Sequence, residues 1–333
     1  MNIIKFFLFG KFRIEADANL LHKFEPQKAK ELLVYLLLYR EQPQSREHLA
    51  DALWRELAPE QSKAYLRKAL WQLQTILESC GGQGMLLVDG EWLQINQDFD
   101  FWLDIEIVEK IFKNTQGVRG KDLEKEQARS IQEAVNTYRG NLLEGWYQDW
   151  CLYERERLQF LYLAMLDKLM DYCESHEAYE KGLLFGERIL QYDRARERTY
   201  RRLMRLHHLA GDRTAALRQY QRCVAALKEE LDVGPADRTR LLYEKIRADK
   251  LEAPAQPNRV NNERYQPRGK PRTPSSAASG GVLNPEGNKK SNDTEEPLSM
   301  LFSHLNTLHQ SLSQIQTQLG DDLKVIQKTL ERN

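Results

Sequence analysis

The chain has 333 residues, of which 41% are hydrophobic and 29% are charged, a composition typical of globular domains joined by polar segments. Lysine plus arginine and aspartate plus glutamate each number 49, so the formal net charge is zero. A uniformly basic nucleic-acid-binding protein is therefore excluded, and any contact with DNA must come from a local patch. The length predicts two or three domains of ordinary size.

Cysteine spacing and hydropathy predict a cytoplasmic protein that makes no membrane contact. The four cysteines lie far apart without a C-x-x-C pair, which argues against a zinc site and against a disulfide framework. No apolar run reaches the roughly 18 residues that a membrane-spanning helix needs. The apolar stretch Ile3–Phe9 is interrupted by Lys5 and continues as an alternating pattern, so it predicts a strand rather than a signal peptide.

Residues 1–98 predict a small α+β domain. Strands are expected around Phe6–Ile14 and Leu20–Phe24, followed after Pro26 by a helix whose leucines recur at helical spacing. Ser45 is a good N-cap for a second, short helix.

A third helix is predicted from Pro59 to Leu77, with leucines on one face and a polar, partly basic face opposite. Beyond it, Asp89-Gly90 lies between two short apolar runs. This dipeptide predicts a hairpin closed by a type I′ turn, which needs positive φ at both central residues.

The order of strands, three helices and a hairpin is that of a winged helix with an additional N-terminal sheet. In such a domain the third helix enters the major groove of DNA, and the hairpin, or wing, contacts the backbone or the minor groove. The pattern alone leaves a second interpretation open, in which the basic face of the third helix is only a solvated surface.

Several motifs of the chain resemble a known family of bacterial transcription activators, the SARP class. Three segments resemble its DNA-binding domain, a winged helix of the OmpR type: Leu32–Leu38, Ser45–Trp54 and Glu60–Leu70. Three later segments resemble the signature of the bacterial transcriptional activator domain that follows in this family: Tyr138–Gly145, Asp149-Trp150 and Glu154–Leu158. The similarity extends over roughly residues 4–248, and the motifs occur in the family's order.

The resemblance implies binding to promoter DNA through the third helix and its wing, with recruitment of RNA polymerase. The side chains expected to contact DNA are Arg46, Lys63, Arg67, Lys68, Trp71, Gln72 and Trp92. Lysine and arginine bind guanine edges or phosphates, and glutamine can bind adenine. Two interpretations of Trp71 stay open, because it could contact thymine methyl groups or pack against the second domain.

Other features of the sequence weaken the expected DNA binding. The family's further arginines near Gln72 and Gln74 are missing, and residues 1–98 hold 12 basic and 13 acidic residues, a net charge of −1. Each lost phosphate contact removes nearly one unit from the salt slope of binding. We therefore expect DNA binding to be weak or to depend on dimerisation.

Residues 99–250 predict a helical, TPR-like domain. Pairs of residues recur at an offset of 34, the TPR period, as in Leu169-Met170 and Leu203-Met204. Nine arginines and only two acidic residues lie between positions 194 and 222. The arginine run predicts a basic partner-binding surface that includes Arg198, Arg202 and Arg205, and the alternative is an arginine-rich solvated helix face.

The last part of the chain predicts a linker and an oligomerisation helix. Residues 251–297 have the composition of a disordered linker. Residues 298–333 carry apolar side chains alternately three and four positions apart, which predicts a coiled coil between copies of the chain. Its expected contact residues are Leu301, Leu305, Leu308, Leu312, Ile315 and Leu319. Docking on another protein, or folding back on the helical domain, are the alternatives.

Motifs for catalysis are missing from the sequence, which has no Walker A, GxSxG or HExxH pattern. We therefore expect a mainly α-helical protein that binds no cofactor or metal and is not an enzyme. Its expected partners are double-stranded promoter DNA, RNA polymerase subunits and a second copy of itself. The rival hypothesis is a protein-interaction scaffold whose winged helix no longer reads DNA.

Overall fold

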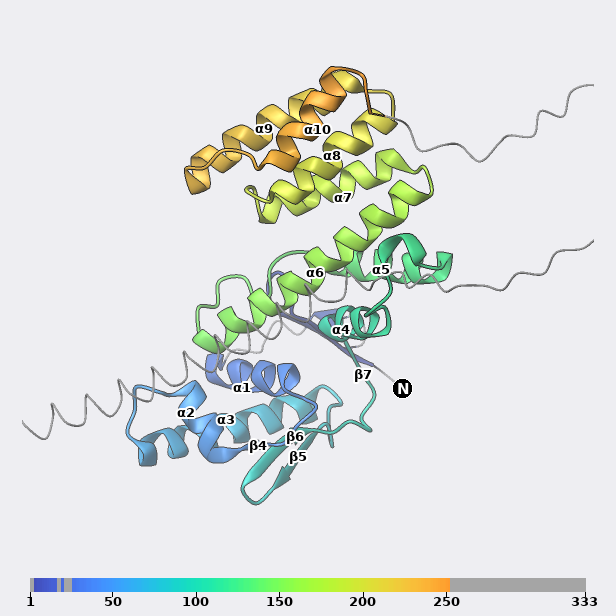
Figure 1. Cartoon of the computed structure of the whole chain (residues 1–333). Helices are drawn as coiled ribbons and strands as arrows, with labels where there is room; N and C mark the ends of the chain where they lie inside the picture. Colours follow the sequence, from blue (N-terminus) through green and yellow to red (C-terminus); the bar gives the residue numbers. More distant parts are fainter. Residues whose placement is uncertain (1–2, 17–18, 21–25, 252–333) are drawn as a thin grey trace, which may run out of the picture. The chain divides into compact units, whose positions relative to one another are not determined.

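The computed structural model describes residues 3–16, 19–20 and 26–251. This part of the chain is mainly helical and contains two small sheets, as the sequence predicts (Figure 1). Nearly all of the predicted linker, and the whole predicted coiled-coil helix, lie outside the described residues. None of the described helices is long and apolar enough to cross a membrane.

A four-stranded sheet with the order β3-β2-β1-β7 begins the fold. β1 (Ile4–Phe7) and β2 (Arg13–Ala16) are antiparallel, and β2 pairs in the same way with β3 (Asn19–Leu20). The prediction of one strand over residues 6–14 is therefore wrong. The chain reverses at Gly10, where φ is +79°, and Phe6 faces Ile14 across the sheet. The predicted strand at residues 20–24 lies mostly outside the described residues.

The fourth strand, β7 (Phe101–Leu103), pairs parallel with β1 and leads directly into α4 (Asp104–Asn114). Asp104 is 2% exposed. Its Oδ2 accepts the backbone N–H groups of Leu8 and Phe9 at 2.8 and 2.9 Å, and its Oδ1 accepts that of Ile105 at 2.8 Å. Burial raises the pKa of Asp104 to about 6, although the three N–H donors act to lower it. The carboxyl thus joins the end of β1 to the start of the helical region.

The winged helix consists of three helices and a second sheet with the order β4-β6-β5. The elements are α1 (Gln27–Leu38), β4 (Gln44–Ser45), α2 (Arg46–Leu53), α3 (Pro59–Ser79), β5 (Leu86–Asp89) and β6 (Trp92–Ile95). The Ser45 hydroxyl accepts the N–H of His48 at 3.1 Å, which confirms the predicted N-cap of α2.

The wing differs from the prediction at its turn. Asp89 pairs with Trp92, so the two loop residues are Gly90 and Glu91 rather than Asp89 and Gly90. Only Gly90 has positive φ, at +47°, and glycine at this first loop position is typical of a type II′ turn. The predicted hairpin is thus confirmed, and the predicted type I′ turn is wrong.

The helical region continues with a short 3₁₀ helix at Gly120–Asp122 and six α-helices. These are α5 (Lys125–Thr137), α6 (Asp149–Ser175), α7 (Tyr179–Tyr192), α8 (Glu197–Leu209), α9 (Arg213–Leu231) and α10 (Asp237–Arg247). α6 packs on α7, α7 on α8, and α8 on α9. Gly182 lets α7 approach its neighbours, because an added Cβ would lie 3.0 Å from Leu206 Cδ1. Gly211, with φ of +84°, forms the turn between α8 and α9.

The segment before α6 joins the helical region to the N-terminal sheet. The N–H of Leu143 donates to the carbonyl of Leu8 at 2.9 Å, and the N–H of Glu144 donates to that of Gly10 at 2.8 Å. Arg155 of α6 then donates to three carbonyls of this segment, those of Leu142, Leu143 and Trp146, at 2.8 to 2.9 Å. The signature residues of the sequence therefore build the junction between the two regions. The predicted boundary at residues 98 and 99 stays a prediction, since the described residues on both sides of it belong to one compact unit.

Replacement of Arg155 by lysine tests this junction. A lysine ammonium cannot reproduce the planar set of N–H donors, so buried carbonyls lose partners, at a cost of about 1–3 kcal/mol. We expect the free energy of unfolding in urea to fall by that amount. The matched control is Arg129→Lys. The Arg129 side chain is 72% exposed and forms a surface ion pair with Glu133, so this substitution should change the free energy of unfolding by less than about 0.5 kcal/mol. Equal effects of the two variants would contradict the assigned role.

Candidate nucleic-acid interface

α3 is held in place by one face and leaves the other free. Leu66, Leu70, Leu73 and Leu77 are between 0% and 6% exposed and form the packed face. The opposite face is exposed at Ala64, Arg67, Lys68, Trp71 and Thr75. A helix anchored along its whole length in this way presents its outer side chains on a rigid support, which is what a groove-reading element requires.

The charge on this free face is positive. Between Glu60 and Glu78, at its two ends, α3 carries no acidic residue. Arg67 and Lys68 are exposed, and neither has an ion-pair partner among the residues that the structure describes. Lys63 lies 3.8 Å from Glu60, a weak surface pair that a phosphate could replace. Gln72 is half-buried at the edge of the face.

Trp71 is the largest apolar group on α3 that faces outward. Its side chain is 67% exposed, so the interpretation in which it packs against the second domain is wrong. Tyr65 on the same helix is 44% exposed. On the wing, Leu87, Val88 and Trp92 are 48%, 38% and 50% exposed, while alternate residues of β6 are buried. The third helix and the wing therefore carry apolar as well as basic surface.

Arg46 contacts the wing, and its expected contact with DNA stays a prediction. Its Nε donates to the carbonyl of Gly90 at 2.7 Å, and its backbone N–H donates to that of Glu91 at 2.8 Å. These two bonds fix the wing turn against the start of α2. The turn itself carries exposed Asp89 and Glu91, which repel phosphates, so the wing tip adds no electrostatic attraction for DNA.

α1 connects α2 and α3 to the helical region. The hydroxyl of Tyr35 lies 2.8 Å from Nε2 of His48 on α2, and its ring packs edge-on against Trp150 of α6, with centroids 5.4 Å apart. Glu109 of α4 receives Arg40 at 2.6 Å and Arg157 of α6 at 2.5 Å. The winged helix is thus bound to α4 and α6 through both aromatic packing and ion pairs.

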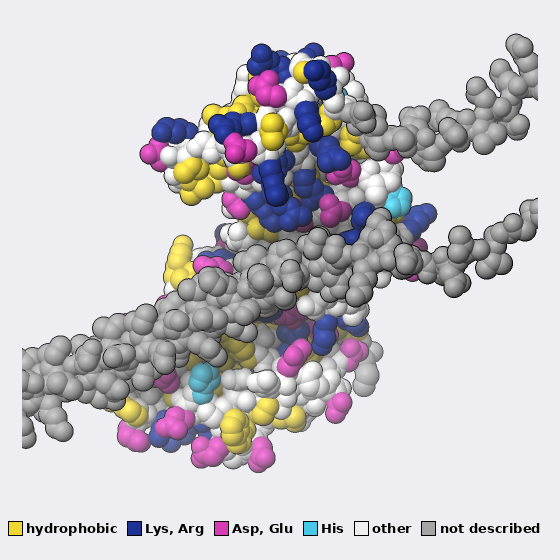
Figure 2. Space-filling view, in the orientation of Figure 1, with side chains coloured by type: hydrophobic (Ala, Val, Ile, Leu, Met, Phe, Trp, Pro, Cys, Tyr) yellow, Lys and Arg dark blue, Asp and Glu magenta, His cyan; other side chains and the backbone are white. Residues whose placement is uncertain are grey.

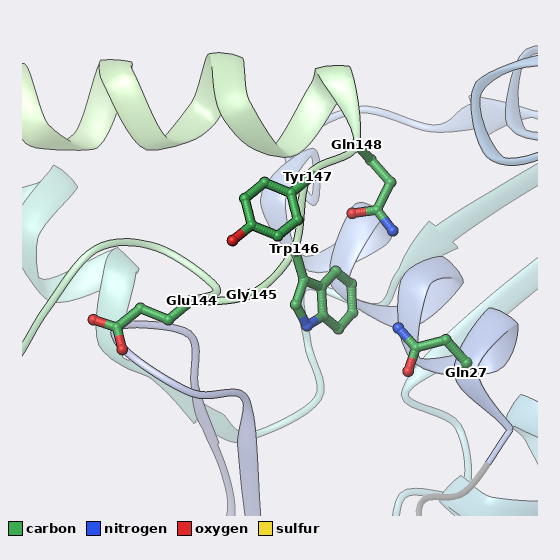
Figure 3. Close-up of a pocket in the computed structure, with 6 residues that line it drawn as sticks. All are labelled: Gln27, Glu144, Gly145, Trp146, Tyr147 and Gln148. Carbon is green, nitrogen blue, oxygen red and sulfur yellow. The ribbon is translucent and has the colours of Figure 1, made fainter.

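A groove of about 550 Å³ lies where this connection reaches the surface. Figure 3 shows the indole of Trp146 at its centre, with Gln27 of α1 on one side and Glu144 on the other. The remaining lining comes from Gly145, Tyr147 and Gln148, and Tyr147 is 76% exposed. The groove is wide and shallow and has no cluster of charged groups, so we assign it no ligand.

Lysine and arginine side chains gather over the C-terminal helices on the face shown in Figure 2. Most arginines of the predicted basic surface are engaged with acids across helices. Arg202 is 12% exposed and binds Asp167 at 3.0 Å and also Asp171, and Arg205 lies 3.0 Å from Glu174. The arginine run therefore includes a set of structural ion pairs, a role that neither sequence interpretation included. Arg198 is exposed, with no acidic partner in the described part of the chain.

Comparisons with known proteins agree with this architecture. Residues 103–247 match the family model described as bacterial transcriptional activator domain. Among solved structures, the chain is similar to Mycobacterium tuberculosis EmbR in complex with a low-affinity phosphopeptide, with a TM-score of 0.57 and 19% identity over 76% of this chain and 67% of that chain. At this identity the likeness shows the fold alone. A comparison with curated proteins gives no match. Residues 103–247 thus carry a bacterial transcriptional activator domain, which confirms the part of the sequence resemblance that concerns this domain.

Proposed function

We propose that the protein binds promoter DNA through α3 and the wing and activates transcription through contacts between its helical domain and RNA polymerase. The observation that carries this proposal is the free face of α3, which combines a rigid apolar anchor with exposed cations that lack acidic partners among the described residues. The proposed activity belongs to the cytoplasm and needs neither a cofactor nor a catalytic step.

Electrostatics limit how the DNA contact can work. Residues 1–98 have a net charge of −1, and α3 carries only three cations, Lys63, Arg67 and Lys68. With few phosphates neutralised, a single winged helix binds DNA weakly and with a shallow salt dependence. Base contacts in the major groove must then supply a larger share of the affinity.

Pairing of two copies would compensate for a weak single contact. Two linked winged helices bind neighbouring half-sites at a high effective concentration, which raises affinity without any new contact. The apolar repeat of residues 298–333 has the spacing of a coiled coil, and we assign the pairing to it. Direct or inverted half-sites would both fit, since the linker of residues 251–297 is long.

The contact with polymerase is assigned to the arginine-bearing side of α8. Arg198 is exposed and without an acidic partner in the described residues, and Arg205 keeps 58% exposure beside Glu174. These two arginines suit an acidic segment of a partner. Arg202 contributes to this surface mainly by holding α8 on α6, because it is largely buried. The helix pairs themselves form the TPR-like support.

The double variant Arg67→Ala/Lys68→Ala tests the DNA contact. Loss of two cations should reduce affinity for a selected duplex at least about tenfold and lower the salt slope of log Kd by nearly two units. Fluorescence anisotropy across a salt series measures both quantities. The matched control, Lys125→Ala/Arg129→Ala, removes two exposed cations from α5 and should leave both quantities unchanged. An unchanged affinity in the α3 variant would favour the scaffold hypothesis, in which the winged helix no longer reads DNA.

The double variant Leu305→Asn/Leu312→Asn tests the pairing of copies. Two polar side chains at equivalent seam positions weaken a coiled coil, so the molar mass from light scattering should fall to that of a monomer, with a matching loss of DNA affinity. The control Ser303→Asn/Gln310→Asn changes positions that the same heptad places on the outer face. A monomeric wild-type protein, or equal masses for both variants, would contradict the assignment.

A further inference from the structure

Four side chains at the centre of the free face of α3 place apolar groups around one cation. At 100° per residue, Ala64, Lys68, Trp71 and Thr75 lie within about 60° of one another around the helix axis. All four are exposed, and Trp71 is 67% exposed. The Thr75 hydroxyl donates to the carbonyl of Trp71 at 2.9 Å, which occupies its proton within the helix and leaves its methyl group available. The centre of the face therefore offers a methyl, an indole and a second methyl around one ammonium.

The surroundings of this apolar centre identify the class of partner. Arg67 and Lys68 lie beside it without acidic partners in the described chain, and the only acids of the helix are at its ends. A protein partner would have to bring an acidic group opposite each of these cations, because an unpaired cation is costly to bury. A DNA groove supplies phosphates and guanine edges for such cations. Charge complementarity thus favours duplex DNA as the occupant.

One apolar group is available on base edges in the major groove, the C5 methyl of thymine. Placed against other base edges, an indole would cover amino groups and carbonyls without giving them hydrogen bonds, and each such group costs free energy when it is buried unpaired. An apolar centre on a reading helix therefore discriminates in favour of thymine.

We infer that the centre of the α3 face reads thymine methyl groups in the major groove, with the Trp71 indole as the main contact and Thr75 as a second one. This inference rests on the proposed DNA-binding function and adds the feature of the base that is recognised. Lys68 and Arg67 then bind the flanking guanine edges or phosphates, and Ala64 gives the helix room to approach.

The test compares thymine with deoxyuridine, which lacks only the C5 methyl group. Duplexes that bind the full chain are first selected from a random pool, and each thymine of the best duplex is then replaced singly. At one or two positions the wild-type affinity should fall about fourfold, the effect of one buried methyl group. Trp71→Ala should bind the thymine duplex more weakly and lose the difference between thymine and deoxyuridine at those positions. Because Trp71 is largely exposed, this variant should fold normally, which circular dichroism checks.

Tyr153→Ala is the matched control, since Tyr153 is an aromatic residue of α6 with 61% exposure and should keep the thymine preference. If the wild type binds its selected duplex with the same affinity whether thymine or deoxyuridine is present, the inference fails, although the proposed DNA binding is supported. A preserved preference in Trp71→Ala would also overturn it. If no duplex is selected at all, the proposed function fails and the inference fails with it. A change of molar mass in Trp71→Ala without any change in DNA binding would assign the face to a protein partner instead.

Discussion

The carboxylate of Asp104 binds the backbone N–H groups of Leu8 and Phe9, which lie 96 and 95 positions earlier in the chain. Together with the parallel pairing of β7 on β1, it fixes the first residues of the protein to the start of the helical region. The rest of the arrangement depends on this connection. It completes the four-stranded sheet, and the segment before α6 is hydrogen-bonded to the residues that follow β1. An unpaired carboxyl at this depth would be strongly destabilising, so all three N–H donors are needed at once.

The winged helix is therefore not an independent head on a flexible tether. α1 packs against α3 on one side, and on the other side its Tyr35 and the following Arg40 reach α6 and α4. The hydrogen bond between Tyr35 and His48 extends this contact to α2. A displacement of α6 would consequently change the position of α2 and α3, which gives the helical region and the winged helix a direct physical connection.

Local patterns in the sequence are sufficient to predict the helices, but they do not predict contacts between residues far apart in the chain. The leucine spacing of α1 and α3, and the Ser45 cap of α2, are set by neighbours three or four residues away, so they were predicted correctly. The three-residue strand β7 has no periodicity and is stabilised by β1 almost a hundred residues earlier, which no local pattern reveals. For the same reason the sequence does not reveal the partners of Arg46 and Arg202, since the Gly90 carbonyl and the Asp167 carboxylate lie 44 and 35 residues away. Arg67, Lys68 and Trp71 were expected on the free face of α3, and the structure places them there.

The central claim is that the free face of α3 binds DNA of defined sequence. The most direct measurement is the affinity of the full chain for its best selected duplex, in the presence of excess random DNA, over a series of salt concentrations. The account predicts saturable binding that survives the competitor and weakens only moderately with salt, because few phosphates are contacted. Binding no tighter than to the random competitor at every salt concentration would contradict it.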